Sequence, residues 1–135
     1  MSDDTAPSDA IARWLEGYVA AFSAFDVPGI CGQWAYPVTI LQDGRRFSFA
    51  TRDAFEANVG RLTGFYRRQG VAGARGTVAE LGTVSDTVIS ALIAYELIDQ
   101  DGACLLGWGT PYVYQRTGEG WRAVLGDATG EAAAW

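Results

Sequence analysis

Apolar residues are spaced at helical intervals in the first half of the chain. Over residues 8–25 they recur every three or four positions, which predicts one long amphipathic helix with Ser8 as its N-cap. Asp26 can cap a second, short helix, which carries Trp34 and is expected to stop before Pro37. A third helix is predicted from the N-cap Thr51 to the glycine at position 70, again from its apolar spacing. Three helices are therefore expected before the middle of the chain.

The second half alternates with a period of two, which is typical of strands. A hairpin is also expected at Asp43-Gly44-Arg45, because this turn-forming sequence lies between two apolar runs. The expected strands cover residues 38–42, 46–49, 74–85, 87–99, 103–116 and 121–129. Helices followed by hairpin-linked strands predict an α+β fold, in which long antiparallel strands coil around a helix into a cone that encloses a cavity.

The length of the chain fits one domain. Its 135 residues are 49% hydrophobic, which suffices for a buried core, and no internal repeat or linker divides them. We expect a disordered tail over residues 1–7, a single domain over residues 8–130 and a C-terminal tail over residues 131–135.

The strand expected at residues 87–99 is apolar on both of its faces. Ile89 and Ile93 share one parity, and Val88 and Leu92 share the other. A sheet with water on one side would alternate more cleanly between apolar and polar residues. The second apolar face therefore predicts a cover, most simply a second copy of the chain in a homodimer through the outer face of the sheet.

Charge and composition exclude several classes of function. Ten basic and sixteen acidic residues give a net charge of −6, which disfavours nucleic acid and anionic membrane surfaces as partners. The sequence contains no His and no Lys, so Ser-His-Asp and Cys-His catalysis, His-bound metals and Lys Schiff bases are excluded. We therefore expect no metal and no cofactor.

Cysteine content and hydropathy favour a cytoplasmic protein. Cys31 and Cys104 are too few and too far apart for a disulfide framework or a zinc site, and both are expected to be buried free thiols. The N-terminus lacks the basic and apolar regions of a signal peptide, and no stretch approaches the roughly 20 apolar residues of a membrane span.

Three short segments carry a resemblance to a known superfamily. They are Gly17–Phe22 leading into Phe25-Asp26, then Trp34–Val38, and finally Gly120–Val124. With this order and spacing, residues 8–129 resemble the NTF2-like superfamily, which includes the SnoaL-like and ketosteroid isomerase branches. The resemblance implies a cone of three N-terminal helices packed on a strongly curved, mixed, mostly antiparallel sheet. It also implies an apolar pocket between helices and sheet, and a homodimer that packs sheet against sheet.

The resemblance also suggests a site at Tyr18, which matches the oxyanion-binding tyrosine of the ketosteroid isomerase branch. A buried phenol can donate a hydrogen bond to a developing enolate, although Tyr18 can equally be a core residue on an apolar stripe. The general-base position of that branch holds Gln42, and glutamine cannot accept a proton from carbon at neutral pH. The isomerase branch has a second hydrogen-bond donor, and its position corresponds roughly to Tyr112 in this sequence. The sequence alone leaves open whether the protein is an enzyme.

Asp127 is the acid that the strand pattern places nearest this site. It shares period-two parity with Trp121 and Leu125, so it should face the cone if Leu125 does. An acid among apolar side chains would have a raised pKa and could act as a base or anchor a ligand. The alternative is an acid at the strand end, solvated or bonded to an Arg.

These observations predict an apolar, aromatic pocket that binds a small apolar or aromatic organic molecule. One alternative is a SnoaL-like or isomerase-like enzyme (isomerase, cyclase or dehydratase) that uses Tyr18 and Asp127. Another is a non-catalytic, dimeric protein-interaction domain with a filled cavity. The expected pocket residues are Tyr18, Phe22, Trp34, Tyr36, Val59, Tyr66, Trp108, Tyr112, Leu125 and Asp127.

Overall fold

The three helices of the first half form where the apolar spacing places them. In the computed structural model, which describes residues 6–135, they are α1 (Pro7–Ser23), α2 (Val27–Cys31) and α3 (Arg52–Arg68). Two of the three expected caps are present, because Asp26 accepts a hydrogen bond from the Gly29 backbone N–H and Thr51 accepts one from that of Ala54. Ser8 is not a cap: α1 already begins at Pro7, and no side chain caps it. Most of the tail expected over residues 1–7 lies outside the described residues, and Pro7 already belongs to α1.

Trp34 differs from its expected place on the second helix. Helix α2 ends at Cys31, and Trp34 begins strand β1, where it pairs with Ala123 of the last strand. The peptide bond between Tyr36 and Pro37 is cis, and both residues lie within β1. The backbone before Pro37 is extended because it belongs to β1, and the residue that precedes a proline favours an extended conformation.

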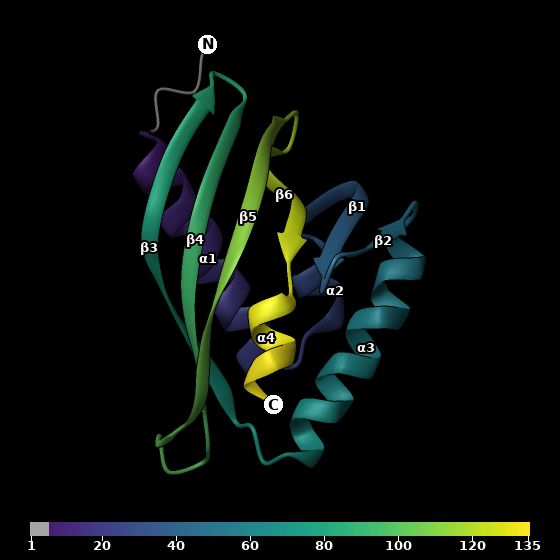
Figure 1. Cartoon of the computed structure of the whole chain (residues 1–135), viewed down its shortest axis with the longest axis vertical. Coiled ribbons are helices and arrows are strands. Elements are labelled where there is room, and N and C mark those ends of the chain that lie inside the picture. The colour runs from purple at the N-terminus through teal and green to yellow at the C-terminus, as the bar shows by residue number, and fades with distance from the viewer. Residues whose placement is uncertain (1–5) are drawn as a thin grey trace.

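Six strands form one mixed sheet beside these helices. They are β1 (Trp34–Gln42), β2 (Arg45–Phe49), β3 (Gly73–Ser85), β4 (Val88–Ile98), β5 (Cys104–Thr117) and β6 (Gly120–Asp127). Their order is β2-β1-β6-β5-β4-β3, and β1 and β6 pair in parallel while all other neighbours pair antiparallel. Figure 1 shows α1 crossing behind the long strands and α3 beside β2. The predicted α+β class, with helices packed on a curved, mostly antiparallel sheet, is confirmed.

A β-bulge interrupts the alternation of β6. The neighbouring residues Val113 and Tyr114 of β5 pair with Leu125 and Ala123 of β6, so one residue of β6 between them has no partner. A bulge of this kind shifts the side-chain parity by one residue. Ala123 is fully buried in the core, whereas Leu125 is on the other face of the sheet.

The core lies between α1 and the face of the sheet that α1 covers. Aromatic rings dominate it: the Trp14 and Tyr18 rings stack with their centroids 4.5 Å apart, and the Tyr114 ring meets Trp14 edge-on. The largest fully buried core side chains are Ile11, Ile30, Cys31, Val38, Ile89, Ile93 and Tyr114.

The last residues of the chain form a helix, α4 (Thr129–Ala134), where only a tail is expected over residues 131–135. Two hydrogen bonds hold its start: the Thr129 hydroxyl accepts from the Asp43 backbone N–H, and the Asp127 carboxylate accepts from the Thr129 backbone N–H. At the other end, the Trp135 ring packs on the Tyr66 ring at 5.6 Å. Helix α4 therefore bridges from the β1–β2 turn to α3.

The two cysteines differ in exposure. Cys31 is buried, as expected, and burial raises the pKa of its thiol to about 11, so it is not a thiolate at neutral pH. Cys104 is exposed, which corrects the expectation that it is buried. It is the first residue of β5, and most residues at that end of the strand are exposed to solvent. Among residues 6–135, no helix has the length and apolar character needed to cross a bilayer.

Candidate functional site

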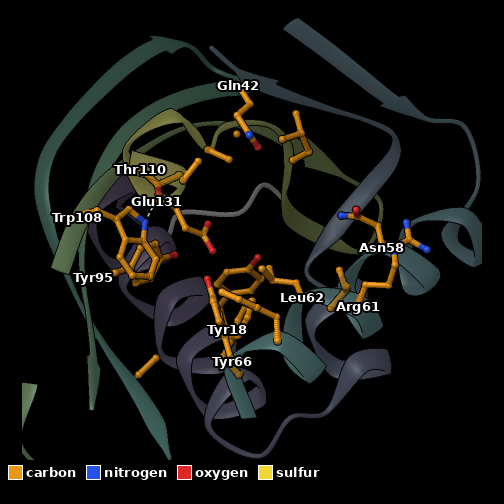
Figure 2. A pocket seen from close by; sticks show the side chains of 18 of the residues that line it. Tyr18, Gln42, Asn58, Arg61, Leu62, Tyr66, Tyr95, Trp108, Thr110 and Glu131 are labelled. Carbon is orange, nitrogen blue, oxygen red and sulfur yellow. Dashed lines mark hydrogen bonds between the residues drawn. The ribbon is translucent and has the colours of Figure 1, made fainter. Parts of the chain in front are cut away.

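A cavity of about 400 Å³ lies between the helices and the covered face of the sheet. Every layer of the fold contributes to its wall: α1, α3 and α4 on one side, and strands from both ends of the sheet on the other. Most of the lining is apolar, and aromatic residues form much of it: Tyr18, Phe22, Trp34, Phe47, Phe49, Phe55, Phe65, Tyr66, Tyr95, Trp108, Tyr112 and Trp135. Figure 2 shows several of these rings around the open space.

The structure brings most of the expected pocket residues together around this cavity, and leaves three of them out. The lining residues among them are Tyr18, Phe22, Trp34, Val59, Tyr66, Trp108 and Tyr112. Tyr36, Leu125 and Asp127 do not line it.

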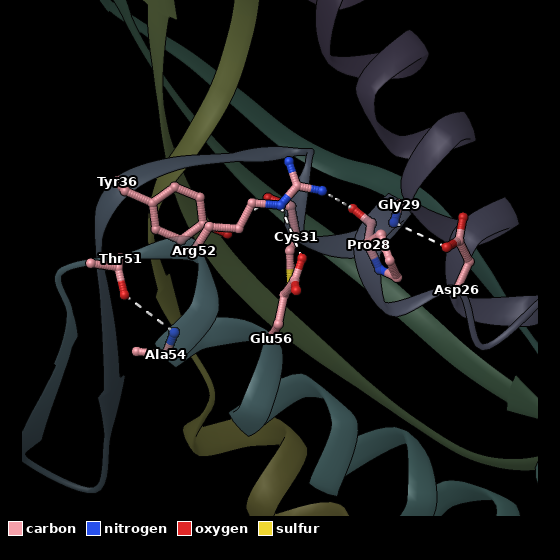
Figure 3. A network of polar contacts seen from close by, with 9 residues as sticks. All are labelled: Asp26, Pro28, Gly29, Cys31, Tyr36, Thr51, Arg52, Ala54 and Glu56. Atoms are coloured by element: carbon pink, nitrogen blue, oxygen red, sulfur yellow. Dashed lines mark hydrogen bonds and ion pairs between the residues drawn. The ribbon is translucent and has the colours of Figure 1, made fainter.

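Tyr36 belongs to a separate polar network, which Figure 3 shows, and is not part of the cavity lining. Its hydroxyl donates a hydrogen bond to the Cys31 carbonyl at 2.9 Å. In the same network, the Arg52 guanidinium donates to the Pro28 carbonyl at 2.7 Å and pairs with Glu56 at 3.0 Å. These contacts join α2 to β1 and α3, so Tyr36 supports the wall from outside.

Leu125 and Asp127 are placed by the bulge in β6. Because the bulge shifts the parity, Gly126 faces the cavity, whereas its neighbours Leu125 and Asp127 do not. The Asp127 carboxylate accepts a hydrogen bond from the Thr129 N–H at 3.0 Å, at the start of α4. The expectation that Tyr18 and Asp127 share one cavity is therefore corrected.

Three tyrosine hydroxyls meet at one side of the cavity. The Tyr95 and Tyr112 hydroxyls are hydrogen-bonded at 2.7 Å, and the Tyr18 hydroxyl accepts a hydrogen bond from the Trp34 indole at 3.2 Å. Burial is the main reason that the pKa of Tyr18, Tyr95 and Tyr112 lies well above 10. All three are neutral at physiological pH, so they offer hydrogen-bond donors and acceptors and no charge.

Two further polar features belong to this wall. The Trp108 indole donates to the hydroxyl of the buried Thr110 at 2.8 Å. The buried Tyr66 hydroxyl has no hydrogen-bond partner among the described residues, although Tyr66 lines the cavity. A buried hydroxyl without a partner is costly, by about 1–3 kcal/mol, unless water or a ligand satisfies it.

Glu131 is the acidic side chain of the cavity lining, and no sequence pattern indicated it as a site residue. It lies on α4, and Figure 2 shows its carboxyl group directed into the open space, on the side of Tyr18. Burial raises the pKa of this carboxyl to about 7. Its charge also raises the pKa of Tyr18, after the larger effects of burial and of Tyr112. The only sequence signal was the Thr129–Ala134 composition, whose run of alanines favours a helix.

The polar rim of the cavity lies opposite this acid. Gln42 of β1 and Asn58 and Arg61 of α3 line the cavity, and Arg61 is exposed to solvent. In Figure 2, Asn58 and Arg61 are on the far side of the open space from Glu131. Gln42 thus presents an amide to the cavity, and the acidic side chain of the lining comes from α4. Residues 6–135 contain no group of three or more Cys, Asp or Glu side chains arranged to hold a metal ion.

Helices packed on a six-stranded mixed sheet, with an apolar cavity between the layers, define an NTF2-like protein. A family model described as "NTF2-like protein (DUF6841)" matches residues 8–128, and the chain belongs to this family. No curated protein sequence matches the chain significantly.

Solved structures of the same fold are distant in sequence. An NTF2-like protein with a cystatin-like fold from Novosphingobium aromaticivorans is 19% identical, with a TM-score of 0.71 over 95% of this chain and 86% of that one. A domain of unknown function with a cystatin-like fold from Nostoc punctiforme is 15% identical, with a TM-score of 0.74 over 93% and 77%. A ketosteroid isomerase-like protein from Erwinia carotovora atroseptica is 14% identical, with a TM-score of 0.61 over 87% and 91%. At these identities the likeness concerns the fold alone.

Proposed function

We propose that this protein binds a small, largely apolar organic molecule in the cavity between its helices and sheet. The observation that carries the proposal is the cavity itself: about 400 Å³, lined by aromatic and aliphatic side chains, with a few convergent polar groups. Ligand sites in proteins have this size and this mixture of an apolar wall and placed polar atoms. A protein-interaction domain with a filled interior, the third alternative from the sequence, is less well supported because this interior is open.

The polar groups of the wall support the same proposal. The buried Tyr66 hydroxyl lacks a partner among the described residues, and the Tyr18 hydroxyl, which accepts from Trp34, also faces the cavity. A ligand with one polar end and an apolar body would satisfy such groups while covering the rings.

A cavity-filling variant tests the proposal. Leu62 of α3 lines the cavity and is half-buried, so Leu62→Trp should occupy the open space, whereas Leu105→Trp places the same ring on an exposed strand outside it. Thermal shift with a panel of neutral and charged one- to three-ring compounds should raise the Tm of the wild type and of Leu105→Trp, and not that of Leu62→Trp. The proposal fails if no compound raises the Tm of the wild type, or if Leu62→Trp responds as the wild type does.

A second candidate function is acid–base catalysis on a cyclic ketone or lactone, as the isomerase resemblance suggests. Glu131 favours it, because its carboxyl has a pKa of about 7 and is directed into the cavity beside the Tyr18 hydroxyl. The carboxylate would take a proton from the carbon next to the carbonyl, while Tyr18 donates a hydrogen bond to the oxygen. We expect the protein to accelerate deuterium exchange at that carbon of 2-tetralone, measured by NMR, and Glu131→Gln to abolish the acceleration. Exchange no faster than in buffer would exclude this function for ketones of that kind.

We also propose a homodimer through the face of the sheet that the helices leave uncovered. Its centre is apolar: Leu92 pairs with Pro111, and Val113 pairs with Leu125, all on this outer face. The charged pair Arg75–Glu96 lies toward the edge of the sheet, in β3 and β4. An apolar centre with charges at its margin is the composition of a subunit interface, and two copies of one such face are self-complementary.

A further inference from the structure

The two charged side chains of the cavity lining do not pair with each other. Glu131 is the acidic side chain of the lining, and Arg61 is its basic one. Arg61 is exposed and lies across the open space from Glu131 (Figure 2). Among the described residues, no side chain forms a hydrogen bond or ion pair with the Glu131 carboxyl. The carboxyl therefore lies in an apolar cavity without a counter-charge from the chain.

A carboxylate in such surroundings must either bind a proton or acquire a cationic partner. The groups around the Glu131 carboxylate favour a cationic partner. The faces of aromatic rings attract cations, and the cavity wall is built of such rings, including Tyr18, Tyr95 and Trp108. Hydroxyl oxygens at the same wall, those of Tyr18 and the Tyr95–Tyr112 pair, can accept hydrogen bonds from an N–H group.

We propose that the ligand of this cavity is an organic cation, an amine with an aromatic or alicyclic body whose protonated nitrogen pairs with the Glu131 carboxylate. The inference rests on the proposed binding function and adds the class of ligand. The body of the amine lies against the rings, and its N–H groups reach Glu131 and the tyrosine oxygens.

Two other ligand classes fit the cavity less well. An anionic ligand would meet the Glu131 carboxylate inside a protein whose net charge is already −6. A neutral alcohol or ketone would supply no counter-charge for the Glu131 carboxylate. Comparison of an amine with its neutral counterpart therefore decides the class.

Matched probes test the inference. We choose benzylamine, 2-naphthylmethylamine and 4-phenylbenzylamine, each with the alcohol that has the same ring system, and measure affinity by isothermal titration calorimetry at pH 8. At least one amine should bind the wild type about tenfold or more tightly than its alcohol. Glu131→Gln should remove this preference, because it keeps the shape of the side chain and removes the charge. Glu119→Gln, in the exposed turn between β5 and β6, is the matched control and should bind as the wild type does.

The pH dependence provides a second readout. The other ionisable groups of the lining are Arg61, Tyr18, Tyr66, Tyr95 and Tyr112. Burial holds the pKa of Tyr18, Tyr95 and Tyr112 well above the ordinary phenol value of 10, so these three stay neutral between pH 6 and pH 8. An alkylammonium group resembles that of lysine and is protonated in this range. With a pKa of about 7, Glu131 is about one tenth ionised at pH 6 and about nine tenths ionised at pH 8. Amine affinity should therefore rise about tenfold from pH 6 to pH 8, and alcohol affinity should not rise.

The outcomes separate this inference from the function on which it rests. Alcohols that bind as tightly as the amines, or amine binding that survives Glu131→Gln unchanged, would overturn the cationic ligand class and leave a binding cavity. Failure of every amine and every alcohol to bind the wild type would overturn both. Circular dichroism and the Tm of each variant show that a loss of binding is not a loss of folding.

Discussion

At the scale of single residues, Glu131 is the side chain whose surroundings most change its chemistry. Its carboxyl titrates at about pH 7 in the folded protein, against an ordinary value of 4.5, because burial disfavours the charged form. Between these two values the unfolded chain releases this proton while the folded chain keeps it. The free energy of unfolding therefore falls as the pH rises from about 4.5 to about 7, and the loss is complete above pH 7.

Glu131→Gln should remove this dependence. The full shift corresponds to about 3 kcal/mol, and partial solvent access of the residue reduces it, so we expect the variant to be more stable than the wild type by about 1–3 kcal/mol at pH 8. At pH 4.5 and below the two should be nearly equal. Urea unfolding at both pH values measures the difference, with Glu119→Gln as the exposed control. A variant less stable than the wild type at pH 8 would show that the carboxylate has a stabilising partner in the fold.

The Tyr95–Tyr112 hydroxyl pair offers a prediction on buried hydrogen bonds. Its two oxygens are 2.7 Å apart in a buried site, so removal of one hydroxyl leaves the other without its partner. We expect Tyr95→Phe and Tyr112→Phe each to lower the free energy of unfolding by about 1–2 kcal/mol, and the double variant to lose less than the sum. Chemical denaturation of the four proteins gives the coupling energy. Additive losses would mean that the two hydroxyls do not depend on each other.

At the scale of elements, α1, α2, α3 and the strands could be predicted from apolar spacing, but α4 and the facing of the last strand could not. Asp26 and Thr51 cap helices where their side chains predict it, since capping is a local interaction. The period-two alternation predicts the wrong face for Leu125 and Asp127, because the bulge in β6 depends on pairing with β5 and β1. The sequence of a single strand does not contain this pairing. Glu131 was missed for a related reason: six residues of α4 are too few for a helical period to be recognised.

Helix α4 depends on a close approach to β5, which gives a prediction at Gly130. A Cβ atom at this position would lie 2.8 Å from the Gly109 carbonyl oxygen, so Gly130→Ala must displace the helix or the strand. We expect a loss of about 1–2 kcal/mol in stability, of the size found for overpacked sites, together with weaker ligand binding because Glu131 moves with α4. Gly118→Ala is the control, since nothing lies within 4 Å of its Cβ position. Unchanged stability and binding in Gly130→Ala would show that α4 is not held against β5 in solution.

At the scale of the whole molecule, the proposed homodimer depends on the outer face of the sheet. Ala94 is exposed on β4 and pairs with Gly109 of β5, near the centre of that face. Ala94→Arg would place a charge in an interface expected to bury about 1,200–2,000 Å² in total. Sedimentation velocity should show a dimer for the wild type and for Gln100→Arg, in the loop beyond β4, and a monomer or aggregate for Ala94→Arg. A monomeric wild type at micromolar concentration would contradict the proposed dimer.

The parallel pairing of β1 with β6 also has a consequence for the time course of folding. It joins Thr39 to Leu125, and it is the only ladder between the β1–β2 hairpin and the antiparallel strands β3–β6 of the described chain. The hairpins on either side close short loops, whereas this ladder joins residues 39 and 125 and closes about two thirds of the chain, so its formation should be the slow step. The cavity borders both parts of the sheet and is complete only after that step. An occupant of the cavity would then slow unfolding and leave the folding rate almost unchanged, because it stabilises contacts that are absent from the transition state.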